Sequence, residues 1–338
     1  MIRALLILAQ IYPANLPLDR YREAAFEDAA MRLDRKLAAG TVKLEFREGF
    51  GYLPSLLAAL DINADSQALV FSKTSFQSQR ISPRNPRAIY FNDTVAVGYV
   101  PGGEGMEVAA LDPNAGTVFY TLENRAVERP RLVRREECLH CHYGTATLGV
   151  PGMFIGSVYP DSTGRPSRDA AIITDHRTPF QDRWGGWYVT NSKLGRSNSA
   201  VSDPAEPHTL SPLPAFRAER YLVPTSDIVA LMTFEHQTHA ANALIRLNWL
   251  ARAGAPAAAV DAAIGDVVAD LTFAGEAPLP EPIEGASTFV KTFPQRGPLR
   301  EFDLKTRLWE SRVSYMIHSG AYAALPEPIR KRIHAAIP

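Results

Sequence analysis

The chain has 338 residues, of which 46% are hydrophobic and 21% charged, so it can bury a sizeable core as one large domain or two modest ones. Its 36 basic and 36 acidic side chains cancel, which excludes the basic field typical of proteins that bind nucleic acid or anionic membranes. No stretch is long and apolar enough to cross a bilayer, so we expect no membrane span.

Residues 1–14 have the pattern of a short secretory signal peptide. Met1-Ile2-Arg3 is positively charged, residues 4–11 are apolar apart from one glutamine, and Ala9 is a small residue suited to cleavage. The alternative is a first buried strand or helical turn. A signal peptide would place the mature protein in the periplasm or outside the cell.

Residues 15–190 are predicted to form a helix followed by an antiparallel β-meander. Apolar residues recur at helical spacing over residues 18–39, and a shorter helix is expected over 54–60. From residue 69 the period changes to two, and turn residues at 112–116 and 161–164 indicate hairpins. The predicted strands are 69–71, 88–91, 95–99, 106–110, 117–121, 153–159, 170–174 and 186–190.

Residues 191–338 are predicted to form a polar loop and then a helical region that packs on the first part. The loop covers residues 191–219, and Thr225-Ser226-Asp227 caps a long helix that runs to Gly254. Further helical runs cover 256–273 and, with breaks, 304–337. We therefore predict an α+β fold, with a β-rich scaffold followed by a helical C-terminal half, as two parts or as one domain.

The motif with the clearest chemistry is Cys138-Leu139-His140-Cys141-His142, which reads C-x-x-C-H. Two thiols at this spacing can bond covalently to the two vinyl groups of one porphyrin, and the following histidine can bind the iron as its proximal ligand. The chain has only these two cysteines. The motif predicts one covalently attached haem c, which Cys138, Cys141 and His142 would hold.

Two other types of site could use the same cysteines. A zinc site could combine them with His236 and His239, although that histidine spacing is shorter than usual. A thioredoxin-like redox pair is less compatible, because the surrounding sequence lacks the expected strand-to-helix turn.

The second, distal ligand of the iron distinguishes two kinds of haem protein. Two strong protein ligands are typical of an electron carrier, whereas an open distal position can bind a small molecule. His236 is the first candidate, because the helical periodicity turns it toward the interior with His239. His176, which follows a predicted strand and an acidic neighbour, is the second, and Met153 is the third. A haem without any distal protein ligand is the fourth alternative.

Haem propionates need cationic or hydrogen-bonding partners. The loop 79–87 carries Arg80, Arg84 and Arg87, and Trp187 lies in an aromatic segment flanked by arginines. Arg84, Arg87 and Trp187 are therefore candidate haem-binding residues.

Several runs make the chain resemble a family of largely uncharacterised bacterial secreted monohaem c-type cytochrome proteins with a single C-x-x-C-H. The runs lie at residues 71–75, 81–93, 174–180, 183–190, 235–237 and 314–317. The resemblance covers most of the chain after about residue 50 and implies a c-type cytochrome without a settled activity. In that family the segment W-G-G-W-Y-V-T often continues with Gly-Thr-His-Gly, whereas residues 191–195 here read Asn-Ser-Lys-Leu-Gly, so no role from that segment is carried over.

These observations leave three candidate functions, of which the first two use a haem. The first is a periplasmic electron-transfer cytochrome with a redox partner protein. The second is a haem-dependent oxidoreductase that binds a small molecule at an open iron, such as a peroxide, oxygen or a nitrogen oxide. A zinc-stabilised binding protein is the third.

Overall fold

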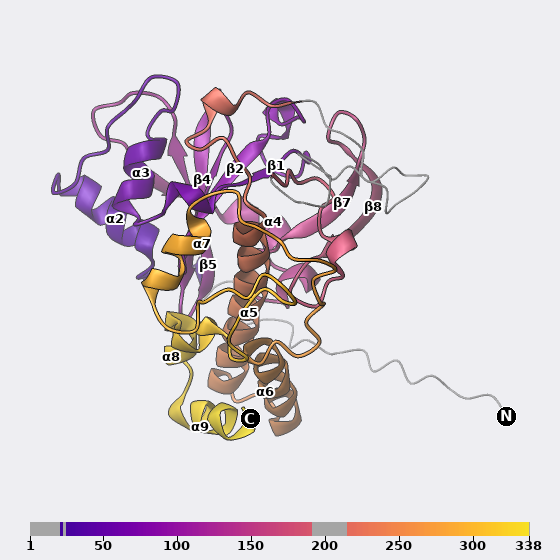
Figure 1. Ribbon diagram of the computed structural model, residues 1–338. Helices are drawn as coiled ribbons and strands as arrows, with labels where there is room; N and C mark the ends of the chain where they lie inside the picture. The colour runs from indigo at the N-terminus through magenta and orange to yellow at the C-terminus, as the bar shows by residue number, and fades with distance from the viewer. Residues whose placement is uncertain (1–20, 23–24, 191–214, 338) are drawn as a thin grey trace.

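A computed structural model describes residues 21–22, 25–190 and 215–337 of the chain, and it has a mixed α+β fold (Figure 1). Six antiparallel strands form one sheet whose spatial order follows their order in the sequence. The predicted meander is thus confirmed. The strands are β1 (Ala68–Val70), β2 (Arg87–Phe91), β3 (Val95–Tyr99), β4 (Gly105–Asp112), β5 (Gly116–Glu123) and β6 (Leu132–Arg134).

The hairpin between β4 and β5 shows how turn residues fix the register. The Asp112 carboxylate accepts hydrogen bonds from the backbone N–H groups of Asn114 and Ala115. Gly116 has a φ of +94°, a conformation that favours glycine, and it pairs with Asp112. This register places Phe119 opposite Ala109 and Thr121 opposite Glu107.

The sheet lies between two helical layers, each covering one face (Figure 1). One face packs on α2 (Ala29–Ala38) and α3 (Leu53–Ala59), and the other packs on α5 (Ile228–Arg252). On the α5 side, Phe91 of β2 stacks on Phe234 with ring centroids 4.4 Å apart. Because side chains alternate along a strand and every residue of β3 is buried, both faces of β3 are covered, whereas one face of β4 is only half-buried.

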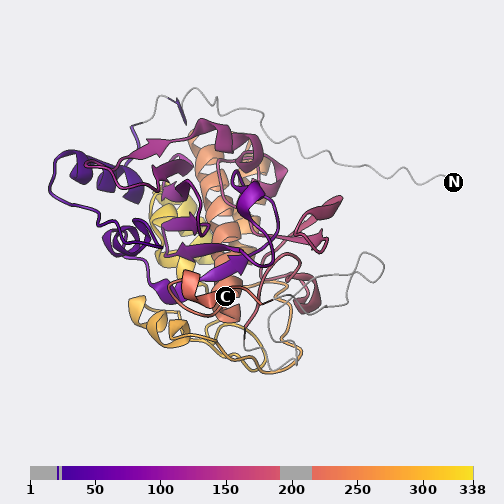
Figure 2. The same ribbon diagram turned by 90° about the horizontal axis from the view of Figure 1, so that it is seen from above.

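A second, two-stranded sheet projects from one side of the molecule (Figures 1 and 2). It pairs β7 (Gly156–Pro160) with β8 (Pro166–Ile173), which confirms the hairpin predicted around residues 161–164. The strand predicted over 186–190 is wrong, because this segment makes only isolated bridges at Trp187 and Thr190. Gly186 has a φ of +91°, and this conformation interrupts an extended strand.

The C-terminal half is mainly helical, as predicted. Asp227 caps α5 by accepting hydrogen bonds from the N–H groups of Val229 and Ala230. None of the described helices is long and apolar enough to cross a membrane. The other helices there, apart from short 3₁₀ turns, are α6 (Ala257–Leu271), α7 (Phe289–Thr292), α8 (Gly320–Ala323) and α9 (Glu327–Ala336).

Two predicted helices differ from the expectation. Within the helix predicted over 18–39, residues 21–22 are helical, residues 25–27 are not, and α2 begins at Ala29, where Asp28 caps it by accepting a hydrogen bond from Met31 N. Residues 304–313 are not helical, and Leu304 has a φ of +59°. Residues 1–14 and most of the polar loop 191–219 lie outside the described residues.

Candidate haem site

The C-x-x-C-H motif lies on one helical turn directly after β6. A 3₁₀ turn, Glu136–Cys138, continues into α4 (Leu139–His142). Leu139 is buried and anchors the turn to the core, whereas Cys138 is half-buried and Cys141 is exposed. Both cysteines are free thiols, and residues three apart on a helical turn lie on the same face. The motif can therefore present two thiols to one ligand edge.

The His142 ring is held by aromatic packing and by one backbone hydrogen bond. Its centroid lies 4.7 Å from that of Phe119 on β5 and 5.2 Å from that of Phe154. Its Nδ1 lies 3.0 Å from the carbonyl oxygen of Gly152. Since a carbonyl can only accept, Nδ1 carries the proton and Nε2 keeps its lone pair. This is the tautomer that a metal ligand needs.

The surroundings of the motif favour a neutral His142 imidazole and a protonated Cys138 thiol. Burial lowers the pKa of His142, so its imidazole is neutral near pH 7. Burial, together with the Glu107 and Glu137 carboxylates, raises the pKa of the Cys138 thiol to about 11. Redox-active cysteine pairs have depressed pKa values instead. The site thus differs in character from a thioredoxin-like centre.

The face of the sheet next to the motif carries an ion pair whose hydrogen bonding is incomplete. Arg87 on β2 pairs with Glu107 on β4 at 3.0 Å, and the strand between them presents Gly98. A Cβ on Gly98 would lie 2.7 Å from Arg87 Nε, so only glycine lets the guanidinium lie across β3. Within the described structure, the buried atoms Arg87 Nε and Glu107 Oε1 have no hydrogen-bond partner. Such unsatisfied atoms are costly unless a ligand completes them.

The residues around the motif fit a c-type haem. Glu107 lies two residues along β4 from Ala109, which is opposite Phe119, the residue that packs on the His142 ring. The donor set comprises two thiols on one turn and an imidazole whose Nε2 keeps its lone pair, and the neighbouring strands carry small residues such as Gly98 and Ala109.

Two other candidate haem-binding residues are not brought to the motif by any contact in the structure. Arg84 is exposed, and its charge acts on Tyr188. Trp187 is buried in the core, and its indole N–H donates to the Gly156 carbonyl at 2.9 Å. Its polar atom is therefore already satisfied.

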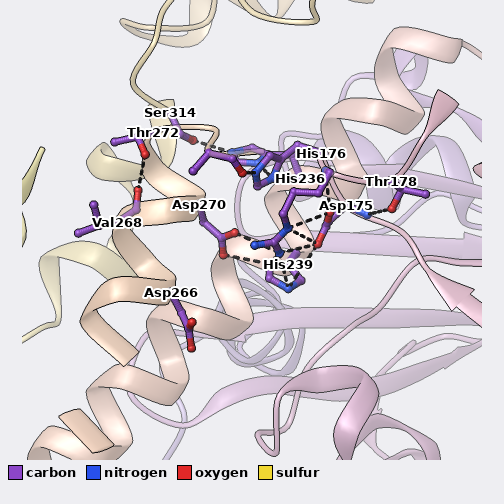
Figure 3. A network of polar contacts seen from close by, with 12 residues as sticks. Asp175, His176, Thr178, His236, His239, Asp266, Val268, Asp270, Thr272 and Ser314 are labelled. Carbon is purple, nitrogen blue, oxygen red and sulfur yellow. Dashed lines mark hydrogen bonds and ion pairs between the residues drawn. The ribbon is translucent and has the colours of Figure 1, made fainter. Parts of the chain in front are cut away.

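His176 and His236, the two leading candidates for the distal ligand, belong to a buried polar network in the C-terminal half (Figure 3). His176 Nε2 lies 3.3 Å from the Ala274 carbonyl, so it carries the proton, and its Nδ1 accepts from His236 Nδ1 at 3.4 Å. His236 Nε2 then accepts from the Ser314 hydroxyl at 2.7 Å. Neither ring keeps a nitrogen free for iron in this structure.

His239, one turn further along α5, is held by acidic neighbours (Figure 3). Its Nδ1 lies 2.9 Å from Asp270, and its Nε2 lies 3.6 Å from Asp175. Burial lowers its pKa, but the bond to Asp270 and the charge of Asp175 outweigh burial and raise it. No group of three or more His, Cys, Asp or Glu side chains in the described part of the chain could hold a metal ion. The four-residue zinc site is therefore not assembled there.

The third candidate for the distal ligand, Met153, is half-buried directly after the glycine that accepts the His142 proton. Its carbonyl accepts a hydrogen bond from the Asn242 side chain of α5 at 2.7 Å. Sequence reasoning missed Gly152, Asn242 and Glu107. A Pro-Gly turn ten residues after the motif histidine and a polar residue within a buried helix were the only signals for the first two.

Comparisons with family models, with curated proteins and with solved structures found no match for this chain. The site therefore has to be interpreted from its own geometry.

Proposed function

We propose that the protein is a c-type cytochrome that carries one covalent haem c and transfers single electrons. One observation carries the proposal. His142 is fixed by the Gly152 carbonyl in the tautomer that leaves Nε2 unprotonated, on the same helical turn as two free thiols. A histidine with only a structural role does not require two neighbouring thiols, and a redox-active cysteine pair does not require a histidine in this tautomer.

Each residue would have a defined part. Cys138 and Cys141 would form the two thioethers, and His142 Nε2 would bind the iron. The bound haem would supply a one-electron iron couple. The Gly152 carbonyl increases the basicity of His142 by accepting its other ring proton, and Phe119 and Phe154 restrict rotation of the ring. Arg87 would place a positive charge beside the site, partly balanced by Glu107.

A haem-dependent oxidoreductase is the second candidate, and one observation favours it. The ring nitrogens of His176 and His236 are engaged by Ala274, Ser314 and each other. Without them the sixth iron position has no assigned histidine. An open position would bind a small molecule such as a peroxide, oxygen or a nitrogen oxide.

The location and the partner belong to the same proposal. Covalent haem attachment takes place outside the bacterial cytoplasm, so a c-type cytochrome would act in the periplasm or as a secreted protein with a redox partner protein. The signal-peptide pattern of residues 1–14 and the resemblance to secreted monohaem proteins support this location.

The decisive experiment is a visible spectrum of the protein expressed with haem-attachment machinery, oxidised and then reduced, with and without carbon monoxide. We expect a Soret band and a haem that stays on the chain after denaturation. A reduced spectrum that is indifferent to carbon monoxide supports electron transfer. A spectrum that shifts supports the oxidoreductase. A protein without any Soret band would overturn both proposals.

A further inference from the structure

We propose that Asn242 of α5 is a positioning residue for the His142 ligand, and that it acts through the peptide segment 151–153. The inference rests on the proposed function, because it explains how a residue outside the motif controls the proximal side of the haem. Asn242 is 4% exposed and lies in the interior of the longest described helix. A polar side chain buried there needs a specific partner.

Three consecutive carbonyls of this segment have three different donors. The Pro151 carbonyl accepts from the N–H of Thr117 on β5 at 2.7 Å. The Gly152 carbonyl accepts from His142 Nδ1 at 3.0 Å, and the Met153 carbonyl accepts from Asn242 Nδ2 at 2.7 Å. The sheet therefore holds one end of the segment and α5 holds the other, with the bond to the ligand between them.

Close packing makes this arrangement specific. A Cβ on Gly152 would lie 2.2 Å from Asn242 Oδ1, so the side-chain amide rests directly against the peptide that accepts the histidine proton. The Gly152 N–H in turn donates to the His142 carbonyl at 2.9 Å. His142 and Gly152 are thus joined by two hydrogen bonds, and the Asn242 side chain packs directly against Gly152.

The expected effect follows from the direction of the hydrogen bond. A carbonyl that accepts from Nδ1 makes the imidazole more basic and stabilises the more positive, oxidised iron. If Asn242 is lost, the Met153 carbonyl loses its donor, and the neighbouring Gly152 carbonyl is held less firmly. The bond to His142 weakens, and the reduction potential rises.

The first test compares Asn242→Leu with Asn248→Leu. Asn248 is an equally buried asparagine on the same helix, but its side chain donates to the Pro113 carbonyl at 3.2 Å, away from the segment. We expect Asn242→Leu to change the reduction equilibrium constant about tenfold, which is about 59 mV for one electron. A shift no larger than that of Asn248→Leu would overturn the proposal.

The second test uses complementation, and it remains decisive if Asn242→Leu fails to fold. Gly152→Ala alone places a methyl group against Asn242 Oδ1, whereas Gly152→Ala with Asn242→Ala makes room for it. We expect the double variant to load haem better than Gly152→Ala alone. A double variant that is no better would show that Asn242 does not hold this peptide.

A third readout needs no haem and separates failure of this inference from failure of the proposed function. Nitrogen NMR of the haem-free full chain reports which His142 nitrogen carries the proton. We expect the Nδ1–H tautomer in the parent chain and a mixture of tautomers in Asn242→Leu. An unchanged tautomer in Asn242→Leu would count against the inference, whereas a parent chain that never loads haem would count against the cytochrome.

Discussion

Two histidine-bearing regions of this protein differ in what surrounds each ring nitrogen. In the C-x-x-C-H turn, His142 gives one nitrogen to a carbonyl and keeps the lone pair on the other, beside two free thiols. In the C-terminal network, His176 and His236 use both nitrogens for contacts within the protein. His176 and His236 are buried whereas His142 is half-buried, and the rings also differ in their hydrogen bonding.

The comparison shows why a buried histidine is weak evidence for a metal ligand. The helical pattern correctly places His236 in the interior, where it is 1% exposed. The same position surrounds it with partners that complete its hydrogen bonds. A ligand needs an unprotonated nitrogen with an open approach, which only the partners reveal.

The largest expected effect concerns the thiols. Changing Cys138 and Cys141 together to Ala should abolish covalent retention of haem, because no thioether can form. The measurement is haem absorbance that remains with the denatured polypeptide. The control is His236→Gln, which should retain covalent haem. Full retention by the double cysteine variant would invalidate the proposal that Cys138 and Cys141 attach haem.

Removal of one partner from a buried ion pair beside the network should strongly destabilise the protein. Arg183 and Glu235 are 2.5 Å apart, with side chains 2% and 0% exposed. Arg183→Met should lower the free energy of unfolding by about 3–5 kcal/mol, because the Glu235 carboxylate would remain buried without its partner. Urea denaturation measures this.

The matched control for that pair lies on the surface. Arg35 and Glu27 are 2.8 Å apart, with side chains 52% and 63% exposed. Arg35→Met should cost no more than about 1 kcal/mol, because solvent screens the pair. If Arg183→Met and Arg35→Met lowered the free energy of unfolding equally, burial would not explain the stability of the Arg183–Glu235 pair.

The network should also make stability depend on pH. Burial lowers the folded-state pKa of His176 and, together with neighbouring histidines, that of His236 below the unfolded value of about 6.5. The unfolded chain then binds more protons, so each group should reduce stability by up to about 1.4 kcal/mol per unit as pH falls below about 6.5.

His239 contributes with the opposite sign. Its raised folded-state pKa gives stability that is present below about 6.5 and is lost as pH rises through the folded value. Denaturation curves at pH 7.5 and 5.5 test the balance, and His236→Gln should flatten the acid-side slope. An equal slope in that variant would mean that His236 is not kept neutral by the fold.

The smallest expected effect is a change in reduction potential that depends on Arg87 but not on Arg84. Arg87→Gln should lower the reduction potential, because it removes a positive charge close to His142 and leaves Glu107 unpaired. A threefold change in the equilibrium constant corresponds to about 30 mV. Arg84→Gln should leave the potential unchanged, because Arg84 is exposed. Potentiometric titration decides whether the two arginines differ.

Patterns of period two and local turn residues were sufficient to predict the first five strands of the meander and the hairpins, but not the short β6. Helical spacing and Asp227 were likewise sufficient for α5. The predictions failed where one residue decides the outcome, as at Asp28, which caps α2 after the non-helical residues 25–27, and at Gly186, whose positive φ prevents a strand. Such effects are local, but hydrophobic periodicity does not report them.

The candidate site likewise has a part that the sequence predicts and a part that it does not. The spacing of the motif alone predicts the two thiols and His142, because they lie within one turn. The partners that decide the state of each histidine are remote. Ser314 is 78 residues from His236, and no pattern in the sequence connects them.

The segment that presents the Gly152 carbonyl also has a consequence for the order of folding. Its bond to His142 closes a loop of ten residues, whereas the bond between Met153 and Asn242 spans 89. Short loops close with a smaller loss of chain entropy than long ones. During synthesis the histidine and its acceptor would therefore meet well before α5 emerges. Mutations in α5 should then leave early loop formation intact and change how firmly the ligand is held in the finished protein.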